Sequence, residues 1–253
     1  MIPADTLFYL VAIPAVLISG MAKGGLGNML GTACVPLMAL VIPPVQAAAI
    51  ILPLLLVMDC LSLWKFRGQV HIEALKTILP ACFFGVAIAA LVFSHPSEQH
   101  VRLLIGAISL LFCFFQWLKR NNPDKQPASY RWGSFWGVLG GFTSFGIHAG
   151  GPPVTIYLLP LRLSSHLFMG TQAWIFASMN IEKIIAYGAT GELNSENLIA
   201  SATLLPFTPI GVLMGYGLLN HLPEKVIYGF SYLCLTVLGS ILFLQGIGLL
   251  PSL

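Results

Sequence analysis

Two glycine-rich clusters, each carrying one basic side chain, interrupt apolar stretches of this sequence. The first cluster runs from Gly20 to Gly31 and contains Lys23, and the second runs from Gly140 to Pro153 and contains His148. Glycines at such a break let another backbone or a ligand approach closely. A helix that begins after the break directs its free N–H groups and positive dipole end at whatever lies beside it. The two clusters therefore predict an anion-binding site that needs few charged side chains.

The residues in and after these clusters supply candidates for binding that anion. Lys23 can pair with an anionic group inside a membrane, or it can be an anchor at the cytoplasmic face. His148 can donate to an anion, or it can be a buried histidine bonded to a carbonyl oxygen. Hydroxyls and amides in apolar surroundings can likewise bond to the protein itself, and glycines can serve helix packing. The uncharged candidates are Gly24, Gly25, Gly27, Asn28, Thr32, Gln46, Ser144, Gly150, Gly151, Gln172 and Trp174.

Two carboxylates within apolar stretches, Asp59 and Glu182, are candidates for proton coupling. Ionisable residues inside a membrane are functional candidates by default. Two other interpretations stay open: Asp59 can reach the inner interface near Lys65, and Glu182 can pair with Lys183. We expect no metal and no cofactor, because the five cysteines lack metal-ligand spacing and the glycines lack the setting of a nucleotide-binding loop.

The composition excludes an ordinary soluble domain. The chain has 253 residues, of which 57% are hydrophobic and 8% charged, whereas soluble domains carry about 25% charged residues. So few charged residues cannot keep the surface of a soluble domain hydrated, whereas a lipid bilayer can surround an apolar surface. We therefore expect an all-α integral membrane protein, multi-pass, in a bacterial-type inner membrane. The N-terminus has no basic residue before its apolar run, so we expect no cleavable signal.

About ten apolar segments lie between polar breaks, five in each half. Six are long enough, at about 20 residues, to cross a membrane as helices: 45–64, 76–94, 101–118, 168–189, 197–219 and 225–248. The first two of each half are shorter, and they either cross as tilted spans or form a hairpin that does not cross. These short segments are 7–22, 28–42, 132–147 and 152–163. We expect a first repeat over residues 1–120, a cytoplasmic linker over 121–131 and a second repeat over 132–253.

The two halves match each other at a shift of about 126 residues. The loop GQVHIEAL, from Gly68, also aligns with GELNSENL, from Gly191. Placing most basic residues inside the cell requires an odd number of crossings in each half, which predicts inverted repeats. In secondary transporters built this way, the site lies near the midplane between the repeats. The matching pairs are Gln46 and Gln172, Pro80 and Pro206, Gly85 and Gly211, and His95 and His221.

The clusters and the order of elements after them resemble the TauE/SafE family of sulfite exporters and anion permeases. The resemblance covers nearly the whole chain and includes Gly170-Thr171 and the loop glycines Gly68 and Gly191. Lys23, His148 and Asn28 depart from the family pattern. The first motif is matched by Gly20, Gly24, Gly25, Gly27 and Pro36, and its second copy by Gly137, Gly141, Gly146, Gly150, Gly151 and Pro153.

The resemblance implies transport of a small sulfur oxyanion, either an organosulfonate or sulfite, without fixing the direction. Proton coupling and a homodimer stay open. Three alternative functions stay open: an anion channel, a membrane subunit of a larger complex, and an intramembrane enzyme. The enzyme is the least favoured, because no HExxH or paired catalytic set is present. Nucleic acid is not an expected partner, since the basic residues lie at membrane ends.

Overall fold

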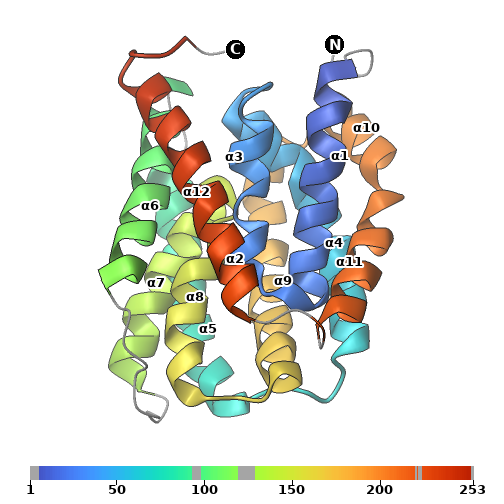
Figure 1. Ribbon diagram of the computed structural model, residues 1–253, viewed down its shortest axis with the longest axis vertical. Coiled ribbons are helices and arrows are strands. Elements are labelled where there is room, and N and C mark those ends of the chain that lie inside the picture. Colours follow the sequence, from blue (N-terminus) through green and yellow to red (C-terminus); the bar gives the residue numbers. More distant parts are fainter. Residues whose placement is uncertain (1–5, 93–97, 119–128, 220, 222–223, 252–253) are drawn as a thin grey trace.

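The computed structural model describes residues 6–92, 98–118, 129–219, 221 and 224–251 (Figure 1). Helices are the only regular secondary structure in these ranges, which confirms the predicted all-α class. Up to residue 118 the elements are α1 (Thr6–Met21), η1 (Ala22–Leu26), α2 (Asn28–Gly31), α3 (Cys34–Met38), α4 (Pro44–Lys65), α5 (Ile72–Val92) and α6 (Glu98–Leu118). The later elements are α7 (Tyr130–Ile147), α8 (Gly151–Leu158), η2 (Leu159–Leu161), α9 (Ser165–Ala189), α10 (Ser195–Leu204), α11 (Phe207–Leu218) and α12 (Glu224–Gly246).

Three helical stretches in the described residues are long and apolar enough to cross a membrane. They are Thr6–Leu26, α4 and α5. The pair α10 and α11, bent by 46°, makes a fourth if it counts as one span. A helix suits such surroundings because it satisfies its backbone hydrogen bonds internally. The predicted linker over 121–131 lies mostly outside the described residues, and the division into two repeats stays a prediction.

The first glycine-rich cluster forms a π-helical turn followed by short helices. The N–H of Gly27 donates to the carbonyl of Ala22 at 3.0 Å, a five-residue step that closes η1. Gly27 has a φ of 91°, a conformation that favours glycine. π-Helical turns are rare and leave carbonyl groups turned away from the regular ladder. The hydroxyl of Ser62 on α4 donates to one of them, the carbonyl of Lys23, at 2.9 Å.

The second cluster ends one helix and starts another. α7 stops at Ile147, and His148 adopts the left-handed conformation with a φ of 53°. Its N–H donates to the carbonyl of Ser144 at 3.0 Å, which closes the last turn. α8 then begins at Gly151, followed by Pro152 and Pro153, and a proline in a first helical turn costs no hydrogen bond.

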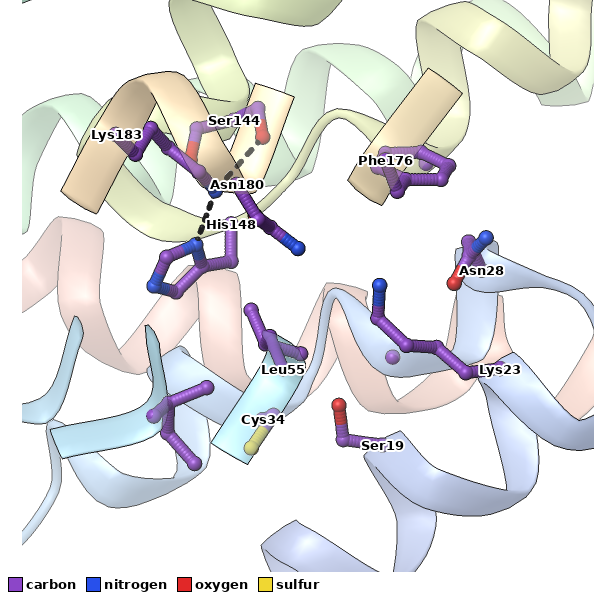
Figure 2. Close-up of a pocket in the computed structure, with 13 residues that line it drawn as sticks. Ser19, Lys23, Asn28, Cys34, Leu55, Ser144, His148, Phe176, Asn180 and Lys183 are labelled. Carbon is purple, nitrogen blue, oxygen red and sulfur yellow. Dashed lines mark hydrogen bonds between the residues drawn. The ribbon is translucent and has the colours of Figure 1, made fainter. Parts of the chain in front are cut away.

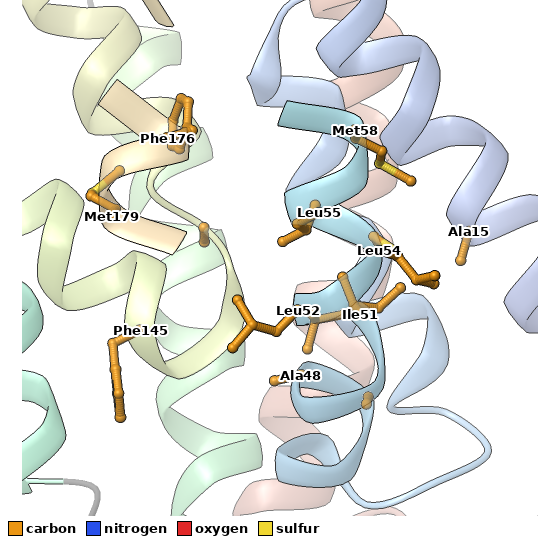
Figure 3. Packing of buried hydrophobic residues seen from close by; sticks show 14 of the residues in the cluster. Ala15, Ala48, Ile51, Leu52, Leu54, Leu55, Met58, Phe145, Phe176 and Met179 are labelled. Carbon is orange, nitrogen blue, oxygen red and sulfur yellow. The ribbon is translucent and has the colours of Figure 1, made fainter. Parts of the chain in front are cut away.

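The core is shared between the early and late parts of the chain. α1 packs on α11, α7 on α5, α4 on α9 and α6 on α12. Figure 3 shows Leu55 and Met58 of α4 lying between Ala15 of α1 and Phe176 of α9, and all four of these residues are buried. Every pair joins one of the helices α1 to α6 to one of the helices α7 to α12. Most of the core therefore forms only when both parts of the chain are present.

Glycines allow two of these helix pairs to approach closely. A Cβ added at Gly141 of α7 would lie 2.0 Å from the carbonyl oxygen of Cys82 on α5. A Cβ added at Gly24 of η1 would lie 2.1 Å from the carbonyl oxygen of Val212 on α11. Small residues at such crossings are typical of membrane helices.

We expect Gly141→Ala to destabilise the protein, because the backbone of α5 must move to admit the new methyl group. Overpacking of this kind costs about 1–3 kcal/mol, and the variant should melt at a lower temperature in detergent. Gly217→Ala is the matched control, because a Cβ at Gly217 meets nothing within 4 Å. Equal melting temperatures for the two variants would contradict the close packing of α5 and α7.

Candidate anion-binding site

A small cavity lies between the two glycine-rich clusters (Figure 2). Elements from two separate parts of the sequence line it: α1, η1, α2, α3 and α4 from the first part, and α7, α8 and α9 from the second. The lining residues are Ser19, Lys23, Asn28, Gly31, Cys34, Ile51, Leu55, Ser144, His148, Gly151, Phe176, Asn180 and Lys183.

Helical spacing explains why these side chains meet. Residues three or four apart lie on one face of a helix. Phe176, Asn180 and Lys183 therefore share a face of α9. Ser19, near the end of α1, lies one turn before Lys23 of η1. Figure 2 shows Lys183 on one side of the cavity and Lys23 on the other.

Lys23 forms a buried ion pair with Asp59. The ammonium group contacts Oδ1 of Asp59 on α4, and the two residues are 6% and 2% exposed. Nδ2 of Asn180 donates to the second carboxylate oxygen, Oδ2, at 2.6 Å. The Lys23 ammonium also lies 5.3 Å from the ring centroid of Phe176. Since each carboxylate oxygen has a donor, Asp59 is well held where it is.

Lys183 is buried without a carboxylate partner among the described residues. Its Nζ donates to the carbonyl and the hydroxyl of Ser144, both at 3.1 Å, and to Nδ1 of His148 at 2.6 Å. An ammonium group can only donate, so Nδ1 of His148 accepts. The other ring nitrogen, Nε2, then carries the hydrogen and donates to the carbonyl of Ala48 at 2.9 Å. His148 is thus a neutral imidazole that orients Lys183.

With both lysines protonated, the cavity has an excess of positive charge. Lys23 and Lys183 line it, whereas Asp59, the carboxylate that pairs with Lys23, lies behind the lining. Lys183 is 1% exposed. A buried charge is costly unless it is paired, and a bound anion would supply that pairing. The arrangement suits a small anion held between two ammonium groups from different parts of the chain.

Five of the residues predicted for binding line this cavity, and one more supports it. Gln172 lies behind Asn28, whose Nδ2 donates to Oε1 of Gln172 at 3.2 Å. Nε2 of Gln172 in turn donates to Thr155 at 3.0 Å. The two partners fix the direction of the Gln172 amide, so this residue positions Asn28. The predicted residues that line the cavity are Lys23, Asn28, Ser144, His148 and Gly151.

The remaining predicted residues lie elsewhere. Gly24 and Gly25 pack against the backbone of α11, and Gln46 donates to Oδ1 of Asn197 at 3.1 Å. Trp174 is 44% exposed. Glu182 also lies outside the lining, and its Oε2 has no hydrogen-bond partner among the described residues. The others outside the lining are Gly27, Thr32 and Gly150.

Sequence analysis did not select Lys183, Asn180, Ser19, Cys34 or Phe176 for this site. The signal for two of them was present, because Asn180 and Lys183 are polar residues three apart inside an apolar helix. A lysine within such a segment is itself a candidate for function. The sequence alone suggests Lys183 only as a partner for Glu182, its neighbour in the chain. Side chains of adjacent residues in a helix do not face each other.

Comparison with known proteins gives one match. The family model described as "Sulfite exporter TauE/SafE" matches residues 12–242, nearly the whole chain. No curated protein matches the sequence, and no solved structure matches it.

Proposed function

Because the chain belongs to the TauE/SafE family of sulfite exporters, we propose that it is a secondary transporter of a small sulfur oxyanion, sulfite or an organosulfonate. Membership of this family makes the chain a multi-pass membrane transporter and implies that it is not an enzyme. We place it in a bacterial-type inner membrane. The proposed binding site is the cavity between the two glycine-rich clusters.

One observation supports this site above the others: two buried lysines face the same cavity. Lys23 comes from the first cluster and Lys183 from α9, more than 150 residues later in the sequence, and both are at most 6% exposed. Hydrogen bonds from charged donors are about twice as strong as hydrogen bonds between neutral groups. An oxyanion between the two ammonium groups can accept hydrogen bonds from Lys23, which donates to one acceptor among the described residues, Asp59. The three N–H groups of Lys183 already have acceptors, so Lys183 attracts the anion by its charge.

We propose that the two halves are inverted repeats, and the packing of the helices supports this. The first helix of each half packs on the fourth segment of the other: α1 on α11, and α7 on α5. The loops behave in the same reciprocal way. The N–H of His71 donates to Thr171 on α9 at 2.9 Å, and Gln46 on α4 donates to Asn197, beside the corresponding later loop.

This symmetry suggests how the site opens to each side in turn. Inverted repeats usually alternate access by moving one bundle against the other around a fixed site. Neither proton-coupling candidate lines the cavity, but Asp59 is the better placed of the two, because it contacts the lining residue Lys23 directly. Protonation of Asp59 would release Lys23 for the substrate.

The proposal predicts sulfite flux through the purified protein. In proteoliposomes, labelled sulfite should move at a rate that saturates with concentration, because each transport cycle binds one anion in the cavity. Empty liposomes supply the background, and unlabelled sulfite should compete with the label.

The competing functions give different results in the same assay. A flux that rises linearly with sulfite concentration would favour an anion channel. No flux of either sulfite or an organosulfonate in well-folded protein would favour a subunit that needs partners, and it would contradict the transporter.

A further inference from the structure

A residue that lines the cavity has a buried hydrogen-bond acceptor with no partner among the described residues: Oδ1 of Asn180. The residue is 1% exposed and belongs to the lining. Its Nδ2 donates to Asp59 at 2.6 Å. A carboxylate only accepts hydrogen bonds, so the NH2 end of the amide must face Asp59. This contact fixes the amide and leaves the oxygen on the opposite side without a donor.

Several other acceptors around the cavity have donors. Lys23 and Asn180 occupy the two oxygens of Asp59, and Lys183 donates to both Ser144 and His148. In the described part of the chain Lys23 donates to one acceptor, so it can still donate to the oxygens of an oxyanion. The unpaired oxygen of Asn180 would repel an oxyanion oxygen, so it needs an N–H or O–H group opposite it.

We propose that Asn180 selects anions that carry their own hydrogen-bond donor. The oxyanion oxygens would lie at the ammonium groups of Lys23 and Lys183, and an N–H or O–H on the same anion would donate to Oδ1 of Asn180. This inference rests on the proposed anion site and adds its specificity. Anions of this class include singly protonated oxyanions and sulfonates with an adjacent amino or hydroxyl group.

The physical basis is the cost of leaving a buried acceptor unpaired. A site that accepts a hydrogen bond from an N–H or O–H of its ligand binds an analogue without that group much more weakly. The buried acceptor in the protein is then left without a hydrogen bond. By contrast, an anion with a methyl group in that place would keep its contacts to the lysines and still lose affinity. The selectivity for anions with a hydrogen-bond donor can therefore be measured separately from the electrostatic attraction to the lysines.

Two anions of nearly equal size and charge test the proposal. Sulfamate carries an amino group where methanesulfonate carries a methyl group, and both are monoanions at neutral pH. Calorimetric titration of the purified protein should show that sulfamate binds about tenfold more tightly than methanesulfonate. This difference is the effect of about one hydrogen bond to a buried group. Equal affinities in the wild-type protein would overturn the proposal.

The variant Asn180→Leu tests whether Asn180 causes the preference for sulfamate over methanesulfonate. It also removes the bond to Asp59, but that loss affects both anions and cancels in the ratio of their dissociation constants. The ratio should fall to about one, while Asn197→Leu, which changes a buried amide outside the lining, should keep it. A ratio that persists in Asn180→Leu would overturn the assignment. If Asn180→Leu does not fold, the wild-type ratio alone decides.

The same titration separates this inference from the proposed function. Binding of both anions with equal affinity leaves the anion site in place and removes only the selectivity. Binding of neither anion, together with no binding of sulfite, means that the cavity is not an anion site, and the inference fails with it.

Discussion

Replacing Lys183 with methionine is expected to reduce sulfite transport by about 100-fold or more, which corresponds to about 2.7 kcal/mol. Methionine keeps the length of the side chain and removes its charge. Lys183 is 1% exposed and pairs with no carboxylate in the described structure, so its charge is available to a bound anion. Losing a buried charged partner of an anion typically costs 2–5 kcal/mol. Flux in proteoliposomes, normalised to folded protein, measures the effect.

Lys183 also has a structural role that the experiment must separate. It donates to the carbonyl of Ser144 near the C-terminal end of α7, where a positive charge stabilises a helix by about 0.3–1 kcal/mol. Lys183→Met should therefore melt slightly lower in detergent. Lys76→Met is the matched control, because Lys76 is an exposed lysine on α5 and should lose neither stability nor flux. Normal transport by folded Lys183→Met would remove this residue from the site.

The second large effect is expected at the ion pair of Lys23 and Asp59. Lys23→Met leaves the Asp59 carboxylate buried without its cation, and breaking a buried pair costs about 3–5 kcal/mol. The double variant Lys23→Met/Asp59→Asn should recover most of that stability. An amide oxygen at position 59 can still accept the hydrogen bond from Asn180, and no charge remains to be paired.

Transport should not recover with stability, because the double variant still lacks one of the two cations that face the cavity. Melting temperatures of the wild type, both single variants and the double variant form a complete cycle that isolates the pairwise energy. Flux is measured on the same four proteins. If the double variant transports sulfite at the wild-type rate, Lys23 acts only as the structural partner of Asp59.

The features readable from sequence were those set by local pattern. Low charge content predicted a helical membrane protein. The glycine clusters lie near the ends of α1 and α7, and their role as breaks in two repeats stays a prediction. Lys23 and His148 were noticed because they stand inside those clusters. Their contacts could not be predicted, since Lys23 pairs with Asp59 on another helix and His148 accepts from Lys183, 35 residues away.

The rest depended on tertiary packing that no local pattern reveals. Gly24 and Gly25 have the same residue type as Gly151, yet they pack against α11 while Gly151 lines the cavity. Trp174 lies two residues after Gln172, and a rotation of about 200° along the helix places it on the outer surface. Which face of α9 turns inward is decided by its neighbours.

The reciprocal packing of α1 on α11 has a consequence for biosynthesis. Gly20 contacts Gly211, a residue made about 190 positions later, which at about 5–20 residues per second is a delay of about 10–40 s. During that interval, α1 and the π-helical turn after it reside in the bilayer without the surface that fits them. Lipid or an insertion chaperone must occupy the glycine face until the ribosome has nearly finished, so a premature stop before α11 leaves that face uncovered.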